Sequence, residues 1–234
     1  MYVDQDKCIG CRLCVKYCPI NAIYMEDKKA HINDDLCTEC VNCKRSECCK
    51  QEALCENELL WPRQVRSLMS NVKTEYKGVN GRGTEEMKTN DVTHRFTPGH
   101  SGIAIELGRP GVSTTLRDLE KIAMAVAKCG VKFEELNPIT SFIVDKKTGK
   151  LNPELLDERA LSGIIEIAVT DDKIETVIKA VQEAAKELDT VISLDCVCVV
   201  DEEGNIAAKD ILDKAGIPYR PNCKTNVGLG RAGL

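Results

Sequence analysis

The stretch that decides the N-terminal fold is residues 8–19, which read Cys-Ile-Gly-Cys-Arg-Leu-Cys-Val-Lys-Tyr-Cys-Pro. Three cysteines are separated by two residues each, and a fourth follows three residues later, directly before a proline. Cysteines this close in sequence are poor disulfide partners for one another, but one loop can bring them to a single compact metal centre. Gly10 lets the backbone approach such a centre, and Pro19 suits the first turn of a following helix. We therefore expect this loop to bind a metal centre.

A second run, residues 37–49, repeats the triple and then departs from it. It reads Cys-Thr-Glu-Cys-Val-Asn-Cys-Lys-Arg-Ser-Glu-Cys-Cys, so the fourth cysteine is either Cys48 or Cys49, and no proline follows. The two halves align if the apolar pair at 22–23 matches the pair at 53–54, each four residues after a cysteine. That alignment favours Cys49 with two inserted residues. Cys48 needs one inserted residue but breaks the downstream match, so both alternatives stay open.

These motifs make residues 1–57 similar to a bacterial two-cluster ferredoxin domain. The intervening residues 22–33 support the similarity, since they predict a short hairpin that turns at Lys28-Lys29. The resemblance implies two 4Fe–4S clusters that pass single electrons. Zinc is the alternative metal, but a zinc ribbon uses two separated C-x2-C pairs rather than a triple followed by Cys-Pro.

The resemblance also implies cross-over ligation, in which the last cysteine of each run binds the cluster of the other run. The implied ligands of cluster one are Cys8, Cys11, Cys14 and Cys49, with Cys48 as the alternative fourth ligand. The implied ligands of cluster two are Cys37, Cys40, Cys43 and Cys18.

The rest of the chain predicts a second part of different composition, so that the whole is an α+β protein. Residues 58–112 are expected to hold a helix over 63–76 and a Gly-rich connector or binding loop over 78–111. Residues 113–234 alternate helices and strands, which predicts an α/β domain for docking or for binding a ligand. Its β-α-β unit suits a ferredoxin-like split β-α-β sandwich.

Within the α/β domain, apolar periodicity places the individual elements. Thr115 with Asp118 predicts the capped start of a helix that ends near Gly130. The other expected helices are 152–163, 174–188 and 207–215, and the expected strands are 141–145, 164–170 and 191–200.

Four further cysteines lie in this second part, Cys129, Cys196, Cys198 and Cys223. They are either small buried hydrophobic residues or a third metal site. Of the three histidines, His31 is expected on the hairpin surface, and His94 and His100 are candidates for contact with a ligand.

Composition restricts the function classes. The net charge of −5 without a clustered Lys/Arg excess argues against nucleic acid binding. No apolar run approaches the ~18 residues of a membrane span and no signal peptide is visible, which predicts a cytoplasmic protein. The sequence shows no flavin, nicotinamide or nucleophile motif, so no catalytic residues are predicted.

The leading hypothesis is therefore the electron-relay subunit of an anaerobic oxidoreductase complex, with a redox partner protein or catalytic subunit. The alternative from another class is a redox-linked sensor whose α/β domain binds a small effector. A self-contained enzyme, with its substrate between the clusters and the Gly-rich stretch, is the weakest alternative.

Overall fold

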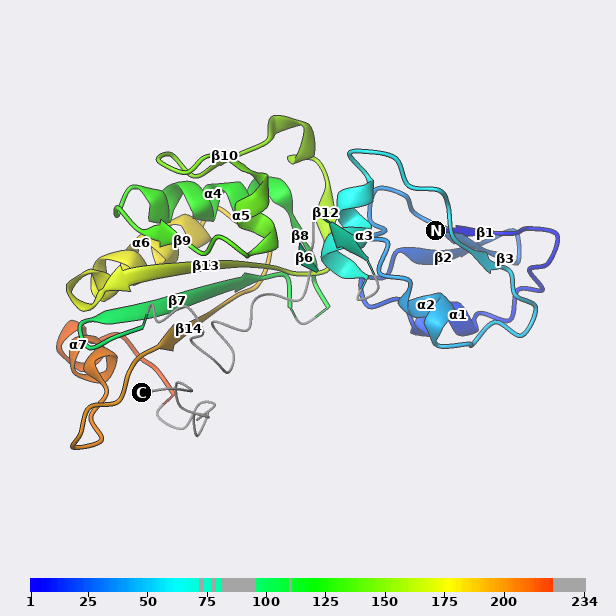
Figure 1. The fold of residues 1–234 in the computed structure, drawn as a ribbon. Coiled ribbons are helices and arrows are strands. Elements are labelled where there is room, and N and C mark those ends of the chain that lie inside the picture. The colour runs from blue at the N-terminus through cyan, green and yellow to red at the C-terminus, as the bar shows by residue number, and fades with distance from the viewer. Residues whose placement is uncertain (72–73, 77–78, 81–95, 110, 221–234) are drawn as a thin grey trace, which may run out of the picture.

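The computed structural model describes residues 1–71, 74–76, 79–80, 96–109 and 111–220 of the 234-residue chain. Figure 1 shows two parts side by side, with the cysteine-rich N-terminal part at one end and a larger helix-and-sheet part at the other. Each part has its own hydrophobic cluster, formed by residues from Met1 to Leu54 and from Val65 to Leu212. The mixture of helices and antiparallel strands agrees with the expected α+β class.

The N-terminal part consists of two small strand pairs and two single-turn helices. Strand β1 (Tyr2–Val3) pairs with β4 (Leu54–Cys55), and β2 (Ile23–Glu26) pairs with β3 (Lys29–Ile32), both antiparallel. The predicted hairpin is thereby confirmed. Helices α1 (Leu13–Lys16) and α2 (Asn42–Arg45) carry the third cysteine of each run.

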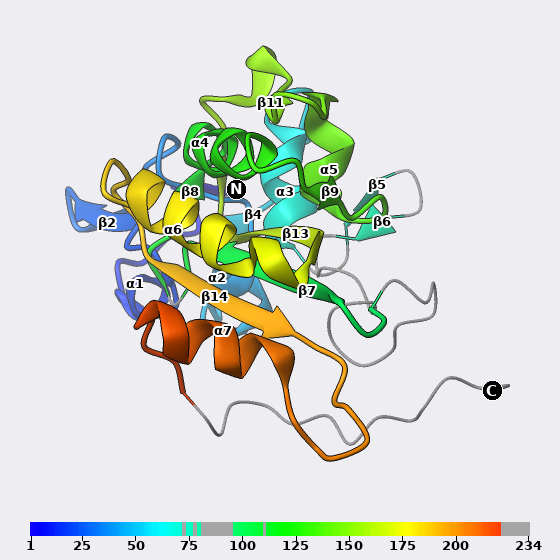
Figure 2. The ribbon, with the colours of Figure 1, turned by 90° about the vertical axis from the view of Figure 1, so that its left-hand side faces the viewer.

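The C-terminal part is built on a four-stranded antiparallel sheet. Its strand order is β14-β7-β13-β9, comprising β14 (Ile192–Val197), β7 (His100–Leu107), β13 (Gly163–Thr170) and β9 (Lys132–Phe133). Helices α4 (Leu116–Ala127) and α6 (Ile174–Ala185) lie together on one face of the sheet (Figure 2). Because β7 lies between β13 and β14, helix α6 crosses over one strand between them.

Apolar periodicity predicted the long helices of this part well. Thr115 caps α4 by accepting from the Asp118 backbone N–H at 3.1 Å, as its sequence indicates. The stripe of α4 that faces the sheet is buried, as is that of α6. Helix α7 (Ala207–Ala215) begins and ends as predicted and adds Ala208 and Leu212 to the same core.

The stretch expected to be a Gly-rich connector contains β7, one of the two inner strands of the sheet. Its side chains Ile103, Ile105 and Leu107 are fully buried against the helices. The sequence did not indicate this strand, because the glycines and polar residues before it interrupt the apolar pattern. Residues 81–95 of the same stretch, with His94, lie outside the described residues.

Two further expectations from the sequence were partly wrong. The strand expected at 141–145 is shortened to β10 (Ile143–Asp145), because Pro138 and the capping Asn137 start helix α5 (Pro138–Phe142) before it. The helix expected at 152–163 is only the 3-10 turn η1 (Pro153–Leu155). The remaining short strands are β5 (Glu75–Tyr76), β6 (Val79–Asn80), β8 (Thr114–Thr115), β11 (Lys150–Leu151) and β12 (Arg159–Ala160).

Helix α3 (Gln64–Ser70) connects the two parts and ends earlier than the helix expected over 63–76. Val65, Leu68 and Met69 are buried in the core of the C-terminal part, as their spacing predicts. Ser70 Oγ accepts from the backbone N–H of Leu161 at 2.8 Å. The first helix after the cysteine-rich part is therefore packed as an element of the C-terminal part. No helix among the described residues has the length and apolar character needed to cross a bilayer.

The packing of α3 predicts the effect of truncating Leu68. The side chain is 4% exposed, whereas that of Leu60 just before the helix is 74% exposed. Leu68→Ala should lower the free energy of unfolding of the C-terminal part by about 2–5 kcal/mol through loss of packing. Leu60→Ala, the matched control, should change it by about 0.5 kcal/mol or less. Urea unfolding followed by circular dichroism measures both, and equal effects would contradict this packing of α3.

Candidate metal centre

The two cysteine loops share one backbone conformation. Gly10 and Arg12 have φ of 70° and 66°, and the equivalent residues Glu39 and Val41 have φ of 54° and 58°. This left-handed region turns the chain sharply enough for successive thiols to face the same side. A Cβ on Gly10 would lie 1.9 Å from the carbonyl oxygen of Lys28, so the first loop admits only glycine there.

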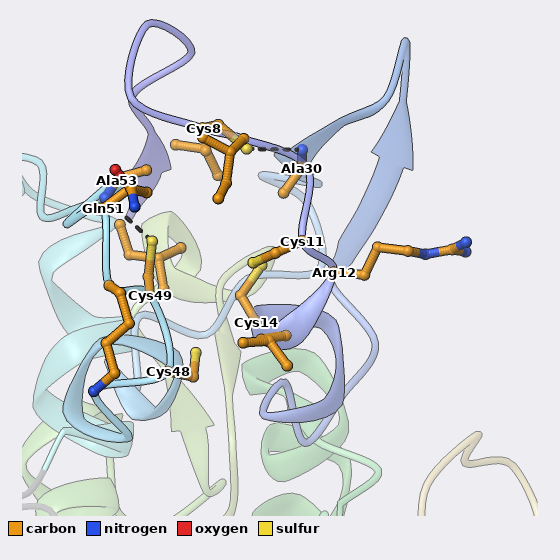
Figure 3. Close-up of a pocket in the computed structure, with 14 residues that line it drawn as sticks. Cys8, Cys11, Arg12, Cys14, Ala30, Cys48, Cys49, Gln51 and Ala53 are labelled. Carbon is orange, nitrogen blue, oxygen red and sulfur yellow. Dashed lines mark hydrogen bonds between the residues drawn. The ribbon is translucent and has the colours of Figure 1, made fainter.

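The first triple shares a cavity of about 130 Å³ with the end of the second run. Figure 3 shows Cys49 across the cavity from Cys11 and Cys14, with Cys48 at its lower edge. The thiols that line the cavity are those of Cys8, Cys11, Cys14, Cys48 and Cys49. The resemblance to two-cluster ferredoxins implied this combination of thiols from both runs.

The last cysteine of the first run lies with the second triple. Burial raises the pKa of the Cys43 thiol to about 12, and the neighbouring thiols of Cys40, Cys37 and Cys18 contribute to the increase. Cys18 is therefore close to Cys43 of the other run, and Asn42 Nδ2, next to Cys43, donates to the carbonyl oxygen of Tyr17, next to Cys18, at 2.9 Å. The structure thus brings together two sets of thiols, and each set takes members from both runs.

Burial also affects the first set. It raises the pKa of the Cys14 thiol to about 11, with smaller contributions from Cys48, Cys11 and Cys49. The thiolate is the form that binds a metal, so a metal bound here displaces protons from these buried thiols.

Cys49 has the same surroundings in the second half as Cys18 has in the first. The backbone N–H of Ala22 donates to Cys18 Sγ at 3.1 Å, and that of Ala53 donates to Cys49 Sγ at 3.3 Å. Each donor lies four residues after its cysteine, in the apolar pair that aligned the two halves. N–H donors to sulfur stabilise the charge of a ligating thiolate.

Cys48 has a different role in the structure. Its thiol is buried and donates to the carbonyl oxygen of Cys43 at 3.5 Å. The thiol that repeats the environment of Cys18 is therefore that of Cys49, although both line the same cavity.

The second loop contains a buried hydroxyl that fits a sulfur-rich group. Thr38 lies between Cys37 and Cys40 and is 1% exposed, and within the described part of the chain its Oγ1 has no hydrogen-bond partner. A buried donor without a partner is costly. An inorganic sulfide of a 4Fe–4S cluster would accept from it, so the donor set of this loop fits such a cluster.

The next residue, Glu39, has a buried and fully paired carboxylate. It is 2% exposed and accepts from Arg63 Nε at 3.0 Å and from Arg63 Nη2 at 2.7 Å. The amino group of Met1 lies 2.5 Å from the same carboxylate. These cations compensate a buried negative charge that would otherwise be costly.

Three of the other cysteines pack at the margin of the C-terminal core. Cys129, Cys196 and Cys198 are half-buried there, and Cys198 Sγ accepts from Ser101 Oγ at 3.3 Å. Cys223 lies outside the described residues. Over the described ranges, no three His, Cys, Asp or Glu side chains converge closely enough to hold a single metal ion, so the thiols of the N-terminal sets are also spaced more widely than the ligands of one ion.

The two described histidines lie apart. His31 on β3 stacks on Tyr24 of β2, with 5.6 Å between the ring centroids. His100 opens β7 and lines a second cavity in the C-terminal part. Neither histidine lines the cavity between the cysteine runs.

Comparison with known proteins agrees with the geometry of the N-terminal part. Residues 1–24 match the family described as the 4Fe–4S binding domain. The N-terminal region is a 4Fe–4S ferredoxin domain. No solved structure matches the chain.

Relatives of the ferredoxin domain align over the N-terminal region. Two uncharacterized ferredoxins of Methanocaldococcus jannaschii are 36% identical over 76 residues and 39% identical over 57 residues. The alignments cover 29% and 22% of this chain, and 41% and 35% of those proteins. The chain therefore spans less than half the length of these relatives.

A third relative has a name that includes a function. It is a subunit of an ion-translocating oxidoreductase complex from Magnetococcus marinus, and it is 47% identical over 30 residues, which are 13% of this chain and 17% of that protein. The family match and these relatives together support 4Fe–4S binding and ferredoxin-type electron transfer for the N-terminal region.

The environments of Cys48 and Cys49 predict different effects of their loss. Cys49→Ser should lower the iron content and change the EPR signal of one cluster, because the loss of this thiolate opens one iron to solvent. Cys48→Ser, its matched neighbour, should leave iron content and EPR signals as in the wild type. Iron analysis and EPR of anaerobically purified protein test this pair. The reverse result would assign the fourth ligand to Cys48.

Proposed function

We propose that this protein relays single electrons through two 4Fe–4S clusters. The observation that carries the proposal is the exchange of last cysteines, with Cys18 close to Cys43 of the second triple and Cys49 in the cavity of the first. The first cluster would be held by Cys8, Cys11, Cys14 and Cys49. The second cluster would be held by Cys37, Cys40, Cys43 and Cys18.

The clusters supply the redox chemistry, and the chain supplies their environment. Backbone N–H groups donate to Sγ of Cys8, Cys18 and Cys49. Interleaved ligands keep the two clusters close together, as a relay of single electrons requires.

The two ends of the relay differ in exposure. Cys11 of the first set is exposed, and Ile9 beside it is 69% exposed. In the second set, Cys37 and Cys43 are buried. We propose that the redox partner approaches the first cluster, where an apolar and accessible edge is available to a protein surface.

The C-terminal part is proposed to attach the relay to a larger oxidoreductase complex. The order β7-α4-β9-β13-α6-β14, with the strands arranged β14-β7-β13-β9, supports a ferredoxin-like split β-α-β sandwich. Electron transfer alone needs no such addition. The similarity to a complex subunit from Magnetococcus marinus is in keeping with a partner protein.

One observation favours the alternative of a redox-linked sensor. The C-terminal part contains a cavity of about 320 Å³ at the end of the sheet, lined by His100, Lys132 and Lys173 among others. These side chains suit a small anionic effector. Calorimetric binding of inorganic phosphate to the full chain, lost in Lys132→Ala, would favour this second candidate.

Cofactor content tests the relay proposal. Protein purified without oxygen should contain about eight irons and about eight acid-labile sulfides per chain, because two cubanes have four of each. Colorimetric iron and sulfide assays give these numbers. About four irons per chain, or stoichiometric zinc, would contradict a two-cluster relay, whereas about twelve would revive a third site that includes Cys223.

A further inference from the structure

One buried arginine joins the loop of the proposed second cluster to the C-terminal part. Arg66 on α3 is 7% exposed and is the only buried Arg or Lys among the described residues. Its Nη1 donates to the carbonyl oxygens of Asp34 at 2.7 Å and Cys37 at 2.8 Å. On its other side, its Nε donates to Glu158 Oε2 at 2.5 Å.

The ion pair of Arg66 and Glu158 has a defined orientation. The guanidinium cation lies between the cysteine loop and Glu158, so the positive charge is next to the loop and the carboxylate is on the far side. Glu158 belongs to the C-terminal part, immediately before β12. A carboxylate of the C-terminal part thus holds a cation against the carbonyl of a candidate iron ligand.

A second close approach involves the same set of thiols. Gly111 of the C-terminal part lies so close to Pro19, which follows Cys18, that a Cβ on it would be 3.1 Å from the Pro19 carbonyl oxygen. Pro19, next to Cys18, and Cys37 itself therefore both contact the C-terminal part through their carbonyl oxygens. The loops that carry the second set of thiols contact that part, while the first set has the exposed Cys11.

The first loop has a different contact at the equivalent position. There the carbonyl oxygen of Gln5 accepts from Lys29 Nζ, a half-buried lysine of the β2–β3 hairpin. This contact stays within the ferredoxin domain. The C-terminal part therefore acts on the second loop through Arg66, and the first loop depends on its own hairpin.

We infer that Arg66 is a positioning residue that raises the reduction potential of the second cluster, under the control of Glu158. The inference rests on the proposed two-cluster relay. Reduction by one electron adds one negative charge to the cluster, with no bond formed or broken. A buried cation and its N–H donors stabilise that added charge, and they act strongly where water is excluded.

The consequence is that the C-terminal part tunes a cluster that it does not ligate. Any partner or ligand that shifts Glu158 changes how tightly Arg66 is held against the second loop. The potential of the second cluster then depends on what the C-terminal part has bound, and that of the first cluster does not.

The test compares substitutions of opposite expected sign in the full chain. Arg66→Met removes the cation and should lower the equilibrium constant for reducing one cluster at least tenfold, which is about 59 mV for one electron. Glu158→Gln keeps the shape but removes the opposing charge, and it should raise the same constant. Arg117→Met is the control, since Arg117 is exposed and pairs with the exposed Asp157 rather than with Glu158.

EPR-monitored potentiometric titration with dithionite as reductant gives the potentials. The signal that survives in Cys11→Ala, which lacks a ligand of the first cluster, identifies the second. The inference is supported if the potential of that signal alone falls in Arg66→Met and rises in Glu158→Gln, and if it is unchanged in Arg117→Met. Unchanged potentials, or shifts of the same sign in both variants, overturn it.

Two additional measurements separate possible failures. If Arg66→Met loses iron, the potentials of Arg66→Lys and Glu158→Gln test the inference instead, since both variants keep a polar group at the interface. About four irons in the wild type would refute the two-cluster relay, whereas about eight irons with unshifted potentials would refute only the role of Arg66.

Discussion

Thiols that lie three residues apart in sequence must reach one small volume, and this constraint determines the backbone of the ferredoxin domain. It requires left-handed residues in both loops, and only Gly10 adopts that conformation without strain. Arg12, Glu39 and Val41 cost about 1–2 kcal/mol each, most clearly the β-branched Val41. A domain with such a small core needs its metal to offset this strain, because metal binding contributes directly to the free energy of folding.

The same constraint explains why two arginines at the start of α3 contact the second loop. Its left-handed Glu39 has a side chain where the first loop has none, and Arg63 pairs with the buried carboxylate. Three residues further along the chain, Arg66 binds the carbonyl of Cys37 and also Glu158. These two arginines lie at the start of α3, whose apolar face is packed in the C-terminal core. Helix α3 thus transmits the position of the C-terminal part to one cysteine loop.

The amino-acid sequence predicted those features that depend on local chemistry. Cysteine spacing and the repeat indicated the two loops, and the apolar pair at 53–54 indicated Cys49, whose Sγ accepts from Ala53 as Cys18 accepts from Ala22. The sequence could not predict features that depend on distant contacts. Strand β7 was missed because the residues before it are rich in glycine. Arg66 gave no signal, because its partner Glu158 lies 92 residues away and an arginine on an amphipathic helix is ordinarily exposed to solvent.

The proposed relay requires two clusters close together in one small domain, held by thiols exchanged between the two runs. Spin quantitation of the fully dithionite-reduced protein tests this requirement most directly, because two neighbouring paramagnetic clusters interact magnetically. We expect about two unpaired spins per chain, with a signal broadened by the interaction between the clusters. A narrow signal that integrates to about one spin per chain, in protein with its full iron content, would contradict the relay.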